Sequence, residues 1–238
     1  MKIGRRYFHP PVWSVLISIG AVTVFSGLGF WQLDRAALKQ EIKDQYAIRL
    51  NSDYLSYPLD VMPVDMVYRK LAFEGSFDAH HHFLLDNRVH RGRAGFHVLT
   101  PFHLKDEAAI VLVDRGWAPW DETRAPLPQI RPALVEGWVR GIVHLPQKSP
   151  FQIGQIALND EWPQLIPYLD LEVLQAQYSS RLLPMVLWMA PDIEGEYVRE
   201  WQPVWMPPEK SRAYAVQWFS FAAITLVLFF ILNMRKVE

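Results

Sequence analysis

The sequence of 238 residues contains no cysteine. A chain without cysteine has no disulfide scaffold, no thiolate site for zinc, copper or an iron–sulfur cluster, and no cysteine nucleophile. It also lacks an excess of positive charge, because 24 Lys and Arg residues stand against 25 Asp and Glu residues. Without a broad basic field to hold a phosphate backbone, a nucleic-acid-binding function is disfavoured.

The linear signatures of common enzyme sites are absent as well. The chain has no glycine-rich phosphate loop, no H-E-x-x-H and no G-x-S-x-G. This is weak evidence against an enzyme, because many active sites have no linear motif. What the sequence does have is apolar character: half of its residues are hydrophobic and ten are Trp.

Two uncharged stretches account for much of this character. Val12 to Phe30 contains no charged residue, and Trp13 and Trp31 stand at its two ends. A helix of that length spans about 28 Å, close to the hydrocarbon core of a bilayer, and Trp favours the interface. A cleaved signal peptide fits less well, because the stretch is long and no small-x-small site follows it. The sequence predicts a transmembrane helix over residues 12–31.

The second uncharged stretch predicts a transmembrane helix over residues 213–232, followed by Arg235 and Lys236. Two spans place both termini on one side of the membrane and the central part of the chain on the other. The basic residues that flank the spans are nearly balanced, so charge alone does not decide the orientation. The short basic N-terminus favours cytoplasmic termini and a periplasmic central domain.

Between the spans, hydrophobic periodicity predicts a helical extension and then a β-rich domain. Leu38, Ile42, Tyr46 and Leu50 recur every four residues, which indicates a helix over residues 32–52. From residue 53 to 210 the pattern favours a mostly antiparallel β domain, a small barrel or sandwich with a few short helices. One helix is expected over residues 171–179, capped by Asp170. The strand-like segments are RKLAFEGSF (69–77), HHFLLDNRV (81–89), GFHVLTPFHL (95–104), AIVLV (109–113), VEGWVRGIV (135–143) and PMVLWM (184–189).

Three adjacent histidines, His80, His81 and His82, are the best candidates for metal ligands. On a strand, His80 and His82 face one way and His81 the other, so at most two of them reach one ion. A third ligand has to come from elsewhere, for example from Asp78 or His103. A solvated start of a strand explains the three histidines more simply.

Two Asp–Arg pairs close apolar strand segments: Asp86 with Arg88, and Asp114 with Arg115. Ion pairs and turn hydrogen bonds at strand ends explain them structurally. The functional alternative is a positive rim for an anionic group or partner, because Arg binds carboxylates such as porphyrin propionates through two parallel bonds. The arginines of this rim are Arg88, Arg91, Arg93 and Arg115.

The second span carries Tyr214, Gln217 and Trp218 near its outer end. Interfacial anchoring explains the two aromatic residues, but an amide in lipid needs a partner. The first span offers small or hydroxyl positions where a neighbouring helix can approach. They are Ser14, Ser18, Thr23 and Gly27. The simplest explanation of these residues is that the two spans pack against each other. The alternative is that they contact a helix of a partner protein or a bound cofactor.

Six segments occur in a characteristic order: GFWQLDRAALK, YRKLAFEGSFD, LLDNRVHRGRAGFHVLTPF, VLVDRGWAP, VRGIV and YAVQWFSFA. Together they resemble the Surfeit-locus family of cytochrome c oxidase assembly factors, from Gly29 to Ala222. The resemblance implies an inner-membrane protein of bacteria, or of mitochondria, that is not an enzyme. Of the two, we expect the bacterial inner membrane. The resemblance also implies help with haem a insertion into the catalytic subunit of a haem–copper oxidase, or with stabilising that subunit.

The resemblance, combined with the residues singled out above, leads to an expected site. Haem a is the expected, transient cofactor. The expected contacts to haem or to the oxidase are Tyr214, Gln217, Trp218, Arg88 and Arg115. The family pattern commonly has a His three positions before the Tyr of YAxQWF, where this chain has Ser211.

The haem ligand and the function class are therefore left open. Five histidines remain as candidate ligands: His9, His90, His97, His103 and His144. Two rival functions stand beside the assembly factor. One is a membrane-anchored metalloenzyme that uses His80 and His82, and the other is a structural scaffold that binds the oxidase without haem.

Overall fold

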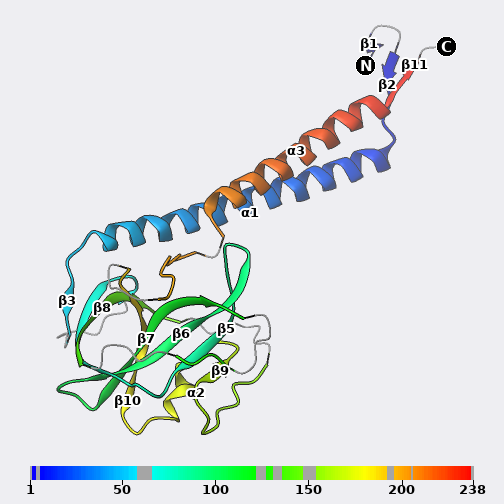
Figure 1. Ribbon diagram of the computed structural model, residues 1–238. Helices are drawn as coiled ribbons and strands as arrows, with labels where there is room; N and C mark the ends of the chain where they lie inside the picture. The colour runs from blue at the N-terminus through cyan, green and yellow to red at the C-terminus, as the bar shows by residue number, and fades with distance from the viewer. Residues whose placement is uncertain are drawn as a thin grey trace. The chain divides into compact units, whose positions relative to one another are not determined.

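The computed structural model describes residues 2–3, 6–57, 66–121, 127–130, 136–146, 154–191, 196–204 and 206–236. The chain divides into two compact units. Unit 1 comprises residues 1–45 and 202–238, and unit 2 comprises residues 46–201. In Figure 1, unit 1 holds two long helices and unit 2 holds most of the strands.

The two long helices of unit 1 are α1 (Val12–Leu50) and α3 (Pro208–Leu232). Both are long and apolar enough to cross a membrane, by length and composition. Helix α1 continues without a break from the first apolar stretch into the charged segment that follows it, and it ends at Leu50. Helix α3 begins at Pro208, before the apolar stretch, because proline is favoured in the first helical turn, where its missing N–H has no intrahelical partner.

The two helices lie side by side (Figure 1). Aromatic side chains and one glycine form the contact between them. Phe25 stacks on Trp218 with ring centroids 5.9 Å apart. Gly29 is buried beside them, and a Cβ at this position would lie 2.7 Å from the Phe219 ring. A Cβ at Gly27 would meet nothing within 4 Å, so the expectation that α3 approaches at Gly27 is wrong.

A small antiparallel sheet joins the two ends of unit 1, and we call it the terminal sheet. Its strands, in spatial order, are β1 (Lys2–Ile3), β2 (Arg6–Phe8) and β11 (Met234–Lys236). Phe8 lies opposite Met234 in the ladder, and the backbone N–H of His9 donates to the Asn233 carbonyl at 3.2 Å. The N- and C-terminal segments therefore lie side by side at one end of the helix pair (Figure 1).

Among the described residues of unit 2, eight strands form one sheet in the order β3-β4-β8-β10-β7-β6-β5-β9, and β6 also pairs with β4. The pairings from β4 through β8, β10, β7 and β6 therefore return to β4 as a closed ring. The parallel pairs are β3–β4, β10–β7 and β5–β9, and the other pairs are antiparallel. The strands are β3 (Leu55–Ser56), β4 (Lys70–Phe77), β5 (Phe83–His90), β6 (Arg93–Leu104), β7 (Ala109–Pro119), β8 (Glu136–His144), β9 (Gln164–Ile166) and β10 (Arg181–Met189).

Apolar side chains cover both faces of this sheet. Val111 and Leu187 belong to one buried cluster, whereas Leu112, Phe83 and Leu174 belong to another. The neighbours Val111 and Leu112 join different clusters because side chains alternate between the two faces of a strand. Strand β7 is buried along nearly all of its length, as the continuous apolar run AIVLV predicts.

Helix α2 (Leu171–Gln175) confirms the predicted cap. A side-chain oxygen of Asp170 accepts hydrogen bonds from the backbone N–H groups of Glu172 and Val173, at 3.0 and 3.4 Å. The helix is shorter than predicted because the Gln175 side chain bonds the chain that follows. Its Nε2 donates to the carbonyl oxygens of Tyr178 and Ser180.

Strand β5 begins at Phe83, and not at His81 as the pattern HHFLLDNRV predicts. Asp78 explains the difference, because its Oδ1 accepts the backbone N–H groups of His80 and His81, at 2.9 and 3.0 Å. An Asp that bonds the backbone two and three residues ahead forms a turn, which competes with the strand ladder. His80 and His82 therefore do not share one face of a strand, and that expectation is wrong.

Candidate functional site

A His–Asp pair lies at the centre of the candidate site in unit 2. His97 of β6 and Asp114 of β7 are joined by a hydrogen bond of 2.8 Å between Nδ1 and Oδ2. The other Asp114 oxygen accepts the backbone N–H of Gly116 at 3.0 Å. Because a carboxylate accepts hydrogen bonds, Nδ1 of His97 is the donor in this pair, and Nε2 is the ring nitrogen that Asp114 leaves free.

Aromatic rings extend the site away from His97. Trp201 lies against His97 with ring centroids 5.7 Å apart, and it stacks on Trp188 at 5.3 Å. The Trp188 ring also stacks on His144 at 4.3 Å. The Trp201 indole N–H donates to the Met189 carbonyl at 2.8 Å, which fixes the orientation of that ring.

Arg88 of β5 contributes a positive charge to this site. Burial lowers the pKa of the Arg88 guanidinium, and the charge of Asp114 acts in the opposite direction. The Nε atom of Arg88 is buried and has no hydrogen-bond partner among the described residues. Burial lowers the pKa of His144 to about 4, with Asp114 raising it and Arg88 lowering it, so His144 is neutral at pH 7.

We call this set of side chains the His97 cluster. Its members are Arg88, His97, Asp114, His144, Trp188 and Trp201. Five of them come from five different strands, β5, β6, β7, β8 and β10, and Trp201 comes from the segment after β10. The ladder gathers them, since Trp188 lies opposite Asp114 and the β6–β7 register shifts between His97 and Leu99.

Sequence reasoning singled out Arg88 and Asp114 but missed the rest of the cluster. His97 and His144 were named only as two of several remaining histidines. The pairing register between distant strands brings them together, and no spacing in the sequence reports that register. The available signal was weak: an Asp that follows directly on the buried run AIVLV needs a buried partner.

Arg115 lies apart from Arg88, because it follows Asp114 directly on β7 and points to the opposite face. Its guanidinium stands 5.1 Å from the centroid of the Tyr197 ring. Burial lowers the pKa of Arg115, and the nearby Tyr197 acts to raise it. Arg115 is close enough to His82 to affect its charge: burial and then Arg115 lower the pKa of His82 to about 4.

The remaining residues of the predicted rim also have separate environments. Arg91 is mostly exposed and forms an ion pair with Glu200. Arg93 is exposed at the start of β6. The Asp86 carboxylate accepts the Trp120 indole N–H at 2.8 Å.

The three histidines divide between different partners. His81 Nδ1 lies 2.6 Å from Asp78 Oδ2, and His103 Nε2 lies 3.7 Å from the same atom. His82 is buried and its Nδ1 lies 3.0 Å from the Thr100 hydroxyl, whereas His80 is exposed. Within the residues that the structure describes, no three His, Asp or Glu side chains are grouped as ligands for a metal ion.

The expected contact residues of α3 lie at positions i, i+3 and i+4, so they share one face of the helix. Tyr214 and Gln217 are exposed, and Trp218 packs on Phe25 of α1. No described residue forms a hydrogen bond with the Gln217 amide. Ser211 is buried and its hydroxyl accepts a hydrogen bond from Lys39 Nζ at 2.9 Å.

Comparison with known proteins identifies the family. The SURF1 family model matches residues 19–223, so the chain belongs to the SURF1 family. A SURF1-like protein of Monosiga brevicollis is 28% identical, over 92% of this chain and 87% of that protein. Surfeit locus protein 1 of Takifugu rubripes is 24% identical, over 94% of this chain and 97% of that protein. The cytochrome oxidase assembly protein SHY1 of Saccharomyces cerevisiae is 29% identical, over 38% of this chain and 24% of that protein.

Proposed function

We propose that this chain is an assembly factor for cytochrome c oxidase and catalyses no reaction of its own. The match of residues 19–223 to the SURF1 family carries the proposal. A relative that bears the name cytochrome oxidase assembly protein supplies the link to the oxidase. The proposed partner is the catalytic subunit, and the proposed cargo is haem a.

The proposed location is a bacterial inner membrane, with α1 and α3 as the two spans. Their length and apolar composition support this placement. Trp13 and Trp31 are both exposed, as expected of indole rings that anchor a helix at the two interfaces. Both termini would lie in the cytoplasm and unit 2 in the periplasm.

Ser211 does not fit the role of haem ligand. A serine hydroxyl is not among the axial ligands that proteins use for haem iron, which are His, Cys, Met and Tyr. The Ser211 hydroxyl is also buried and bonded to Lys39. Unit 1 therefore offers no iron ligand at the position where the family pattern has His.

His97 fits the role of haem ligand by its chemistry. Histidines that bind metals almost always donate their second ring N–H to a carboxylate or carbonyl, and Nδ1 of His97 is bonded to Asp114 in this way. Nε2 is then the nitrogen that would bind iron. Arg88 would offer its unpartnered Nε–H to a propionate.

An optical spectrum of the full chain, purified in detergent from cells that make haem a, tests this proposal. We expect a haem Soret band in the wild type, at least tenfold weaker in His97→Phe. His103→Phe is the matched control, because His103 lies outside the His97 cluster and is partly exposed, and it should keep the band. Co-purification of oxidase subunits without haem would support the scaffold instead, and the absence of both would contradict the assembly role.

Gln217 is the proposed contact to the oxidase within the membrane. Its amide lies on the exposed side of α3 and needs a partner in lipid. Gln217→Leu should lower the yield of co-purified oxidase several-fold while the chain stays in the membrane. Val216→Leu is the matched control, since Val216 is exposed and apolar; equal yields from both variants would exclude Gln217 as a contact.

A further inference from the structure

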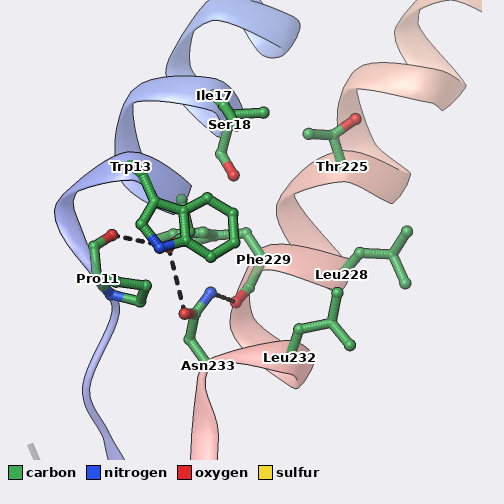
Figure 2. Close-up of a pocket in the computed structure, with 10 residues that line it drawn as sticks. Pro11, Trp13, Ile17, Ser18, Thr225, Leu228, Phe229, Leu232 and Asn233 are labelled. Atoms are coloured by element: carbon green, nitrogen blue, oxygen red, sulfur yellow. Dashed lines mark hydrogen bonds between the residues drawn. The ribbon is translucent and has the colours of Figure 1, made fainter.

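A cavity lies between α1 and α3 at the end that carries the terminal sheet (Figure 2). Its volume is about 370 Å³. In Figure 2 the labelled side chains of α1 lie opposite those of α3. The lining residues are Pro11, Trp13, Ser14, Ile17, Ser18, Thr225, Leu228, Phe229, Leu232 and Asn233.

The walls of the cavity are mainly apolar, and its polar groups are concentrated at one end. There the Ser14 hydroxyl donates to the Pro11 carbonyl at 2.9 Å and lies 3.3 Å from Asn233 Oδ1. The Asn233 amide donates to the Phe229 carbonyl at 2.7 Å. These hydrogen bonds fix the backbone at the start of α1 and at the end of α3. The polar groups at this end of the cavity are therefore held in place by the fold.

The strands next to this polar end contain basic residues. Strand β11 starts directly after Asn233, and in the terminal sheet Arg6 lies opposite Lys236 while Tyr7 lies opposite Arg235. The cations that the sequence places in the two terminal segments are Lys2, Arg5, Arg6, Arg235 and Lys236. No acidic residue lies in the sequence between these basic residues and the apolar stretches of α1 and α3.

We infer that the cavity binds one anionic phospholipid, with an acyl chain between the helices and the phosphate headgroup beside the terminal sheet. The inference rests on the proposed membrane placement of α1 and α3. An apolar slot with a cationic end is complementary to a molecule that is apolar along its length and anionic at its head. A soluble anion would not contact the apolar walls, and a neutral lipid has no net charge to complement the basic residues of the terminal segments.

Native mass spectrometry of the full chain tests the inference. The protein is purified in mild detergent and offered equal amounts of phosphatidylglycerol and phosphatidylcholine with the same acyl chains. We expect one phosphatidylglycerol to be retained at least fivefold over phosphatidylcholine. Equal retention of the two lipids would overturn the inference, and so would a dimer without lipid, because a second copy would then cover the cavity.

Two variants separate the headgroup from the acyl chain. Arg235→Gln with Lys236→Gln should lower the retention of phosphatidylglycerol to that of phosphatidylcholine. Removing the same charge at the other end of α3, by Lys210→Gln with Arg212→Gln, should leave it unchanged. Ser18→Phe should lower the retention of both lipids by filling the cavity, whereas Gly20→Phe should not, because a Cβ at Gly20 meets nothing within 4 Å. Retention that is the same in the wild type and all variants would overturn the inference.

Extraction of the membrane fraction at alkaline pH tests the membrane placement separately from the lipid site. If the chain is absent from the fraction after alkaline extraction, the membrane placement and the lipid site both fail. If it is present and shows no preference for phosphatidylglycerol, only the lipid site fails. Oxidase co-purification is measured separately, and its loss does not bear on the lipid site.

Discussion

At the residue scale, buried histidines connect the fold to pH. The pKa of His144 is lowered from 6.5 to about 4, chiefly by burial, so the folded chain binds its proton less readily than the unfolded chain. As the pH falls from 6.5 towards 4, His144 becomes protonated in the unfolded state but stays neutral in the folded state. Above pH 6.5 His144 is neutral in both states and does not affect the free energy of unfolding. Between pH 6.5 and about 4 it lowers that free energy, by up to about 1.4 kcal/mol per pH unit.

His144→Phe should make the free energy of unfolding less dependent on pH between 6.5 and 4. Phenylalanine can keep the stack on Trp188 but carries no titrating group. Urea unfolding of the full chain in detergent, followed by Trp fluorescence at several pH values, measures this. His80→Gln is the control, because His80 is exposed. A wild-type pH dependence in His144→Phe would show that His144 contributes nothing to it.

Gly75 is the second residue on which the fold depends. It pairs with Gly137 of β8 and with Leu104 of β6, and a Cβ would lie 1.9 Å from the His103 carbonyl oxygen. Gly75→Ala should therefore destabilise the folded chain by about 3 kcal/mol, the upper part of the range for overpacking. Ser76→Ala, one position further on, should change the free energy by less than about 0.5 kcal/mol. Urea midpoints compare the two, and similar midpoints would contradict this account.

At the element scale, the close contact of α1 with α3 depends on Gly29. Gly29→Leu would drive a side chain into the Phe219 ring, whereas Gly27→Leu meets open space. The rings of Phe25 and Phe221 are 5.8 Å apart, so cysteines introduced at these two positions can be cross-linked when the helices are in contact. Because the chain has no cysteine of its own, no other thiol contributes to the cross-linking. We expect cross-linking to fall several-fold with Gly29→Leu and to persist with Gly27→Leu. Equal cross-linking would mean that the helices do not meet at Gly29.

At the scale of the whole molecule, the proposed topology places the two termini in the cytoplasm and unit 2 in the periplasm. Single cysteines at the exposed positions Asp106 and His9 test it. A reagent that cannot cross membranes should label Asp106→Cys in intact spheroplasts. It should label His9→Cys only after permeabilisation. Labelling of both in intact spheroplasts would contradict cytoplasmic termini.

Local patterns of the sequence predicted the helices, the longer strands and the family, but not the short strands β1, β2, β3, β9 and β11. Uninterrupted apolar stretches predicted α1 and α3, and alternation predicted the strands, because helix and strand geometry repeat within a few residues. The errors were also local. Asp78 accepts a hydrogen bond from the backbone N–H of His80, and β5 begins two residues later than predicted. The Gln175 side chain donates to the Tyr178 carbonyl, and α2 ends four residues earlier than predicted. Both errors come from side-chain bonds to the backbone that no periodicity reports.

The site was decided by the tertiary structure. His97 and Asp114 are 17 positions apart, and His144 and Trp201 lie much further along the chain. They meet because the ladder closes into a ring and its register shifts beside His97. The same holds in unit 1, where both ends of the chain build the terminal sheet. Periodicity determines which face a side chain occupies, but only strand register and helix packing decide which side chains share that face.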